Sequence, residues 1–147
     1  MKLLKEAHVR AFVHATESEE KVKGILLQLL PKGAKIESTR LKGHFGNPIV
    51  CLDAHLSETD ALEFWKKILS SLSLDSDGLL RTLEGRVEES CLYLRLDKQL
   101  AAEGKFSLTD SGDAIHIKLR LGGPPSSTDE KIRSLLEAEK EIRSSTI

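Results

Sequence analysis

The sequence predicts a single α+β domain in which helices cover mainly one face of an antiparallel or mixed sheet. Three observations lead to this prediction. The chain has 147 residues, a length typical of one domain with a sizeable core. Several short runs alternate apolar and polar side chains, as half-buried strands do. Between these runs lie segments whose apolar residues recur at helical spacing.

The first half of the chain is expected to form a strand, a helix, two strands and a second helix. Alternation predicts the strands, which span residues 7–16, 35–42 and 49–56. The helices follow a cap at Thr16 or Ser18 and a cap at Ser57. This order is typical of the split β-α-β core of ferredoxin-like domains. Gly24 lies inside the first helix, where glycine costs about 1 kcal/mol relative to alanine, so we expect a close packing contact there.

The second half is expected to add strands and shorter helices. Alternation predicts strands over 91–96 and 114–121, and a brief strand over 105–108. Short helices are expected before Gly85, from Leu79 to Leu83, and between the cap Asp97 and Gly104, while 86–90 forms an acidic connection. The Gly/Pro-rich segment 122–127 is predicted to link the core to a final helix over 128–145, within one domain spanning 1–147.

Composition argues against several functional classes. Lys and Arg total 22 against 23 Asp and Glu, whereas a dedicated nucleic-acid-binding domain is usually basic, with a pI above about 9. Any nucleic-acid role therefore needs a local basic patch. No segment is apolar over the roughly 18 residues that a membrane span needs, so we expect a cytoplasmic protein. Cys51 and Cys91 lie in apolar runs and lack zinc-site spacing, which predicts buried, reduced thiols.

The sequence contains no recognisable catalytic set. Its five histidines form no His-Glu-x-x-His segment, and neither a Gly-x-Ser-x-Gly turn nor a P-loop occurs. Alternation assigns His8, His14 and His116 to the polar faces of strands. We therefore expect no enzyme, no bound metal and no nucleotide cofactor. A weaker alternative is an enzyme centred on His44, Asp97 and Lys98, which would need these side chains to converge in one cleft.

Two segments resemble a known family. The first is Gly43-His44-Phe45-Gly46-Asn47-Pro48-Ile49-Val50, and the second runs from Leu94-Arg95-Leu96-Asp97-Lys98-Gln99 to Gly112-Asp113-x-Ile115-x-Ile117. Together they are similar to the archaeal family described as predicted RNA-binding proteins or predicted exosome subunits. The resemblance implies a small, cytosolic α+β protein, often dimeric, with a ribosomal-protein-like sheet and helices. Its matching motif residues are His44, Asn47, Arg95, Asp97, Lys98, Gln99 and Asp113.

The leading hypothesis is a non-catalytic RNA-associated protein, accessory to RNA processing in connection with the exosome. The basic-Gly-aromatic-x-aromatic strand of an RNA recognition motif is absent, so binding would rest on phosphate contacts and a stacking side chain. The candidate residues are Arg40, Lys42, His44, Phe45, Arg95, Lys98, Gln99, Lys105, Lys118 and Arg120. Two alternatives stay open: a surface balanced by nearby acids, and a homodimeric protein-interaction module that binds no RNA.

Overall fold

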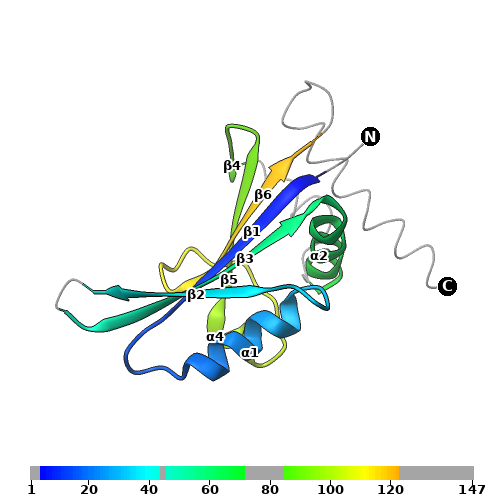
Figure 1. Ribbon diagram of the computed structural model, residues 1–147. Helices are drawn as coiled ribbons and strands as arrows, with labels where there is room; N and C mark the ends of the chain where they lie inside the picture. The colour runs from blue at the N-terminus through cyan, green and yellow to red at the C-terminus, as the bar shows by residue number, and fades with distance from the viewer. Residues whose placement is uncertain (1–3, 44–45, 72–84, 123–147) are drawn as a thin grey trace.

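The fold consists of one sheet and three helices within the residues that the structure, a computed structural model, describes: 4–43, 46–71 and 85–122 (Figure 1). The elements are β1 (Leu4–Val13), α1 (Glu19–Leu29), β2 (Ile36–Lys42), β3 (Pro48–Ser57), α2 (Glu58–Ser71), β4 (Val87–Glu88), β5 (Cys91–Asp97), α4 (Lys98–Ala102) and β6 (Ala114–Leu121). The helix expected before Gly85 and the final helix over 128–145 lie outside these residues. So does the linker from residue 123 onward.

The sheet has six strands in the order β2-β3-β1-β6-β5-β4, and every neighbouring pair is antiparallel. Its centre is the pairing of β1 with β3 and β6, in which Val9 lies opposite Ala54 and Ile117. The antiparallel α+β class is therefore confirmed. Strands β1 and β2, joined through α1, both run antiparallel to β3 between them. The ferredoxin-like assignment stays a prediction, because β5 and β4 extend the sheet beyond β6.

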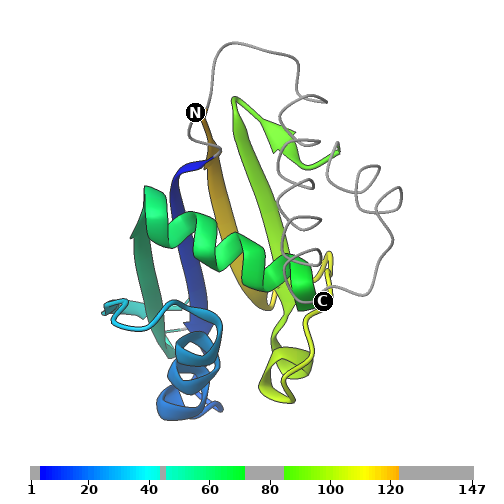
Figure 2. The ribbon, with the colours of Figure 1, turned by 90° about the vertical axis from the view of Figure 1, so that its right-hand side faces the viewer.

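The core lies between one face of the sheet and the helices. Helix α2 crosses that face, and α1 lies on the same side near one end of the strands (Figure 2). Apolar side chains of α2 are buried in this core: Trp65 is 0% exposed, and Phe64 beside it is 1% exposed. Alternation in β1 puts Val9, Ala11 and Val13 in this core, as predicted. One face of the sheet is thus buried in the core, and the described helices leave the other face uncovered.

Local caps set where the short helices begin. Ser18 caps α1 by accepting a hydrogen bond from the Lys21 amide at 3.3 Å. Asp97 caps α4 by accepting from the Leu100 amide at 2.9 Å, and Gly104 follows with a φ of 79°, as the sequence predicted. The expectation of a close contact at Gly24 is wrong for the described residues, because a Cβ there would meet none of their atoms within 4 Å.

The segment after Gly85 differs from the expected acidic connection. It forms β4, which turns tightly into β5 through Glu89 and Ser90, at φ values of 50° and 65°. A two-residue hairpin turn favours this left-handed conformation, but its usual signal is Asn-Gly, which Glu-Ser does not resemble. The expected strand over 105–108 is reduced to a single bridge between Leu96 and Leu108.

Two further expectations can be compared with the structure. Both cysteines are free and buried, as predicted. None of the helices in the described ranges is long and apolar enough to cross a membrane.

Candidate nucleic-acid interface

The face of the sheet opposite the core, which we call the open face, gathers charged and aromatic side chains from all six strands. Paired residues of antiparallel strands share a face, so Arg10 lies beside both Asp53 and His116, and Lys118 lies beside Tyr93. The open face carries Glu6, His8, Arg10, Phe12, Glu37, Asp53, His55, Glu88, Tyr93, Arg95, His116, Lys118 and Arg120. No helix in the part of the chain that the structure describes covers it.

Carboxylates neutralise three arginines on or beside this face. Arg10 Nε contacts Asp53 Oδ1 at 2.7 Å, and Arg86 Nη2 contacts Asp110 Oδ1 at 3.0 Å. The third pair joins Arg120 Nη1 to Glu6 Oε1 at 3.6 Å. These arginines therefore add little net positive charge to the face.

Arg95 and Lys118 have no such neutralising partner. Among the described residues neither has a carboxylate oxygen within 4.0 Å. Arg95 Nη1 donates to the backbone oxygen of Asp110 at 3.3 Å, and Lys118 Nζ lies 5.8 Å from the centroid of the Tyr93 ring. The open-face cations that lack a carboxylate partner among the described residues thus lie on β5 and β6.

Asp53 remains a carboxylate because of its neighbours. Partial burial raises the pKa of Asp53, but the hydrogen bonds from Arg10 and Cys51 and the charge of Arg10 outweigh that effect, so the net pKa lies below the usual value. His8 Nε2 also lies 2.9 Å from Asp53 Oδ1. The pair Arg10–Asp53 is therefore an ionised pair that orders the centre of the open face.

A hollow of about 680 Å³ opens on this face. It lies where two separate chain segments both form backbone hydrogen bonds with the outer edge of β5. The amide of Tyr93 donates to Arg86 O at 2.9 Å, while the amide of Thr109 donates to Arg95 O at 2.9 Å. The ion pair between Arg86 and Asp110 joins the two segments at their junction. The hollow is lined by these segments and by His8, Arg10, Tyr93, Arg95, His116 and Lys118.

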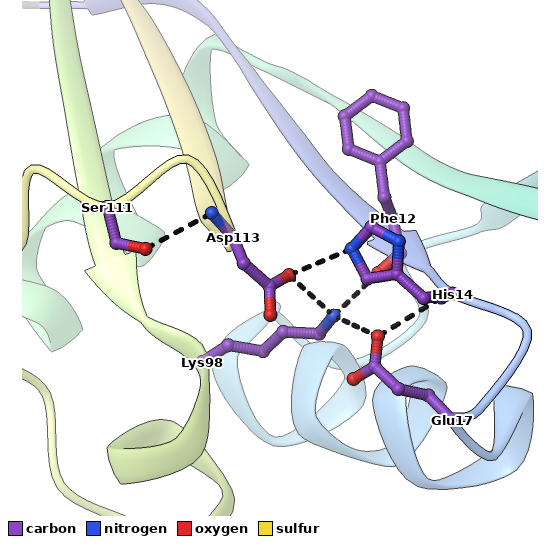
Figure 3. Close-up of polar contacts among 6 residues, drawn as sticks. All are labelled: Phe12, His14, Glu17, Lys98, Ser111 and Asp113. Carbon is purple, nitrogen blue, oxygen red and sulfur yellow. Dashed lines mark hydrogen bonds and ion pairs between the residues drawn. The ribbon is translucent and has the colours of Figure 1, made fainter. Parts of the chain in front are cut away.

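A second polar cluster lies at the end of β1 and surrounds a buried ammonium (Figure 3). Lys98 is 4% exposed, and its Nζ donates to Phe12 O at 2.6 Å, Glu17 Oε1 at 2.8 Å and Asp113 Oδ1 at 3.1 Å. His14 completes this Lys98 cluster, since its Nε2 lies 3.2 Å from the same Asp113 oxygen. The cluster ties the end of β1 to the beginnings of α4 and β6.

The Lys98 cluster also has the composition of a metal site, because ligand atoms of His14, Glu17 and Asp113 lie within 4.8 Å of one another. The Lys98 ammonium, however, already donates to both carboxylates. A divalent cation bound to the same oxygens would face that ammonium at short range, with strong repulsion. The Lys98 ammonium therefore already neutralises the carboxylates that a metal ion would need.

Asp113 makes the stability of the fold sensitive to acid. Partial burial raises the pKa of Asp113, but the hydrogen bond and charge of Lys98 and the contact with His14 outweigh it, and the net pKa lies below the usual value. Because the folded-state pKa is below the unfolded one, this stabilisation is complete above about pH 4 and is lost as pH falls through the folded-state pKa. In urea unfolding, Asp113→Asn should show a shallower loss of stability below about pH 4 than the wild type. Equal slopes would contradict this expectation.

The candidate residues from the sequence do not form one surface. Arg95, Lys118 and Arg120 do lie on the open face. Arg40 lies opposite Val50, on the core side of the sheet, where its Nη2 is 3.9 Å from Glu19 Oε2. Lys42 shares that side of β2.

The remaining candidates lie elsewhere. Lys98 is buried in its cluster, so we remove it from the RNA-contacting set. Gln99 lies in α4, which packs against α1, and Lys105 follows α4; both are exposed. His44 and Phe45 lie outside the described residues. Sequence reasoning missed Arg10, Arg86 and Tyr93 as candidates. For Arg10 and Tyr93, the alternation of buried apolar neighbours in their strands was a sequence signal that both side chains point away from the core.

Comparison with known proteins identifies the family of this chain. A family model described as RNA binding matches residues 6–121, which span every described strand and helix except the first residues of β1. The chain belongs to this RNA-binding family. The resemblance inferred from the two sequence segments is thereby confirmed at the level of the family.

Individual members of the RNA-binding family and solved structures cover nearly the whole chain. An RNA-binding protein of Pyrococcus abyssi is 30% identical over 137 residues, covering 88% of this chain and 89% of that protein. The structure of a DUF54 protein from Methanothermobacter thermautotrophicus has 32% identity and a TM-score of 0.77, covering 92% of this chain and 98% of its own. A protein from Sulfolobus solfataricus gives 28% identity and a TM-score of 0.72, with 90% and 98% covered.

Proposed function

We propose that this chain is a non-catalytic RNA-binding protein that contacts phosphates through Arg95 and Lys118 on the open face. The observation that carries the proposal is the pair of cations on the open face that have no carboxylate partner among the described residues. Phosphate contacts from Lys and Arg supply most of the affinity of sequence-independent RNA binding. Membership of a family described as RNA binding supports the same conclusion.

Several contacts support a role without catalysis. Lys98 is held by three acceptors and Asp97 by its capping bond, so neither is available as the acid, base or nucleophile of an enzyme centred on them. Burial and a hydrogen bond to Asp53 raise the pKa of the Cys51 thiol, which disfavours the nucleophilic thiolate. We therefore propose that the protein binds RNA without catalysing a reaction on it. We extend this to an accessory role in RNA processing linked to the exosome, as the family resemblance implies.

Binding of the wild-type protein should be measurable and salt-dependent. Two phosphate contacts to a flexible strand predict a slope of log affinity against log salt of about −1.4, from about 0.7 per contact. Fluorescence anisotropy with a labelled RNA, titrated from about 50 to 300 mM salt, measures both affinity and slope. No binding at the lowest salt, or an affinity indifferent to salt, would contradict the proposal.

One observation favours the alternative of a homodimeric interaction module. Strand β2 lies at the edge of the sheet and pairs with β3 alone among the described strands, and most of its residues are exposed. Such an edge is able to pair with the same strand of a second copy. Light scattering over a range of protein concentrations decides between monomer and dimer. A dimer that binds no RNA would favour this alternative over the RNA-binding proposal.

A further inference from the structure

We propose that the hollow on the open face holds one unpaired nucleotide, whose base stacks on Tyr93, so that the protein prefers single-stranded RNA to duplex. This inference rests on the proposed RNA-binding function and names the form of RNA that the site takes. It is carried by three features of the described residues: an exposed aromatic ring, a hollow of suitable size beside it, and charged groups at its rim.

The first feature is the position of Tyr93. It is the only tyrosine of the chain and is 42% exposed at the middle of β5, whereas Trp65 and Phe64 are fully buried in the core. An aromatic ring on an uncovered sheet face provides a stacking surface for any base, because every base has a π-face. Lys118 Nζ lies 5.8 Å from the ring centroid, which places a cation next to any phosphate attached to a stacked base.

The second feature is the hollow itself. Its volume of about 680 Å³ lies within the range of roughly 300 to 1,000 Å³ that holds small organic ligands, which includes a nucleotide. Tyr93 lines it together with Arg86 and Asp110 from the two segments that share the β5 edge. The hollow therefore sits beside the ring, where a base that stacks on Tyr93 would enter it.

The third feature is the arrangement of charge around the hollow. Arg95 and Lys118 line the hollow and have no carboxylate partner among the described residues. Their positive charges are therefore suited to contact a phosphodiester backbone. Asp110 brings a carboxylate that is 92% exposed and is able to accept from a base amino group or a ribose 2′-hydroxyl. Phosphate donors and a base-side acceptor thus flank the same ring.

These features favour an unpaired strand over an A-form duplex. In a duplex each base is stacked between its neighbours, so its flat face is not available to an aromatic ring, and its major-groove edge lies in a deep, narrow groove that side chains do not reach. A base is able to reach Tyr93 only when it leaves that stack, which costs a few kcal/mol in a paired duplex and much less in a single strand. The site should accordingly discriminate by strandedness and only weakly by sequence.

The test compares Tyr93→Leu and Tyr93→Phe with the wild type on three ligands. These are a mixed-sequence RNA single strand, the blunt duplex of the same sequence, and an abasic phosphodiester strand of the same length. Stacking of one base contributes about 1–3 kcal/mol, so Tyr93→Leu should weaken single-strand binding by about tenfold while leaving the salt slope unchanged. Tyr93→Phe keeps the ring and should bind as the wild type does.

The outcomes separate this inference from the proposal on which it rests. If the wild type binds neither RNA ligand, RNA binding itself fails. If it binds with a salt-dependent affinity but Tyr93→Leu binds equally well, or the duplex binds as tightly as the single strand, RNA binding stands and the nucleotide site fails. Should Tyr93→Leu not fold, the abasic strand decides: the wild type must bind it about tenfold more weakly than the natural single strand.

Discussion

Replacing Arg95 and Lys118 together by glutamate should weaken RNA binding by about 100-fold at about 50 mM salt. The double variant loses two phosphate contacts and places two negative charges where the RNA backbone would lie, and such like-charge contacts cost several kcal/mol. Both side chains are exposed on the open face, so the substitutions should leave the fold intact. Anisotropy with the labelled single strand measures the affinity, and circular dichroism checks the fold.

A matched control separates this local effect from the change in net charge. Lys23 and Lys32 are exposed on α1 and in the turn after it, away from the open face. Replacing both by glutamate changes the net charge by the same amount, and we expect a loss of affinity below about threefold, from long-range repulsion that salt screens. Equal losses in the two double variants would show that net charge alone governs binding and would remove the assignment to the open face.

Lys98→Met should destabilise the protein by about 2–3 kcal/mol. The substitution keeps an unbranched apolar side chain but removes the buried ammonium and its three hydrogen bonds. A hydrogen bond involving a charged group is worth roughly 1.5–3 kcal/mol, and the carbonyl of Phe12 would lose its partner. The carboxylates of Glu17 and Asp113 are partly exposed, so water recovers part of the loss. Urea unfolding measures the free-energy difference.

The control for this variant is Lys105→Met, since Lys105 is exposed beyond α4. We expect its stability to change by less than about 0.5 kcal/mol. RNA affinity gives an independent readout, because Lys98 lies outside the open face and its folded variant should bind RNA as the wild type does. A fully stable Lys98→Met protein would refute the structural role, and a folded variant with lost RNA binding would return Lys98 to the interface.

Arg95 and Lys98 illustrate which parts of the site a sequence is able to predict. Their nearness in the sequence predicts one basic surface that contains both. Arg95 lies in β5, where alternation with Leu94 and Leu96 already indicates a side chain pointing away from the core. Lys98 is the first residue of α4, and its environment comes from Phe12 and Glu17, more than 80 residues earlier in the chain. No local pattern contains that information.

Local patterns also predicted most of the elements, together with the caps Ser18 and Asp97, because alternation and capping act over a few neighbouring residues. They missed β4, whose two residues are too few for a period and whose turn lacks the usual glycine. The hollow was not predicted either, because it forms only where β4 and the bridge at Leu108 lie along the same edge of β5.

The α+β class, the core side of each long strand and the membership of an RNA-binding family were therefore readable from the amino-acid order alone, because they depend on short-range periodicity and on two sequence segments. The neighbours of each residue across the sheet were not. Antiparallel pairing of β1 with β6 joins Arg10 to His116, and pairing of β5 with β6 joins Tyr93 to Lys118. Such register comes from long-range packing of the buried face, and it alone brings the ring, the hollow and the unneutralised cations together.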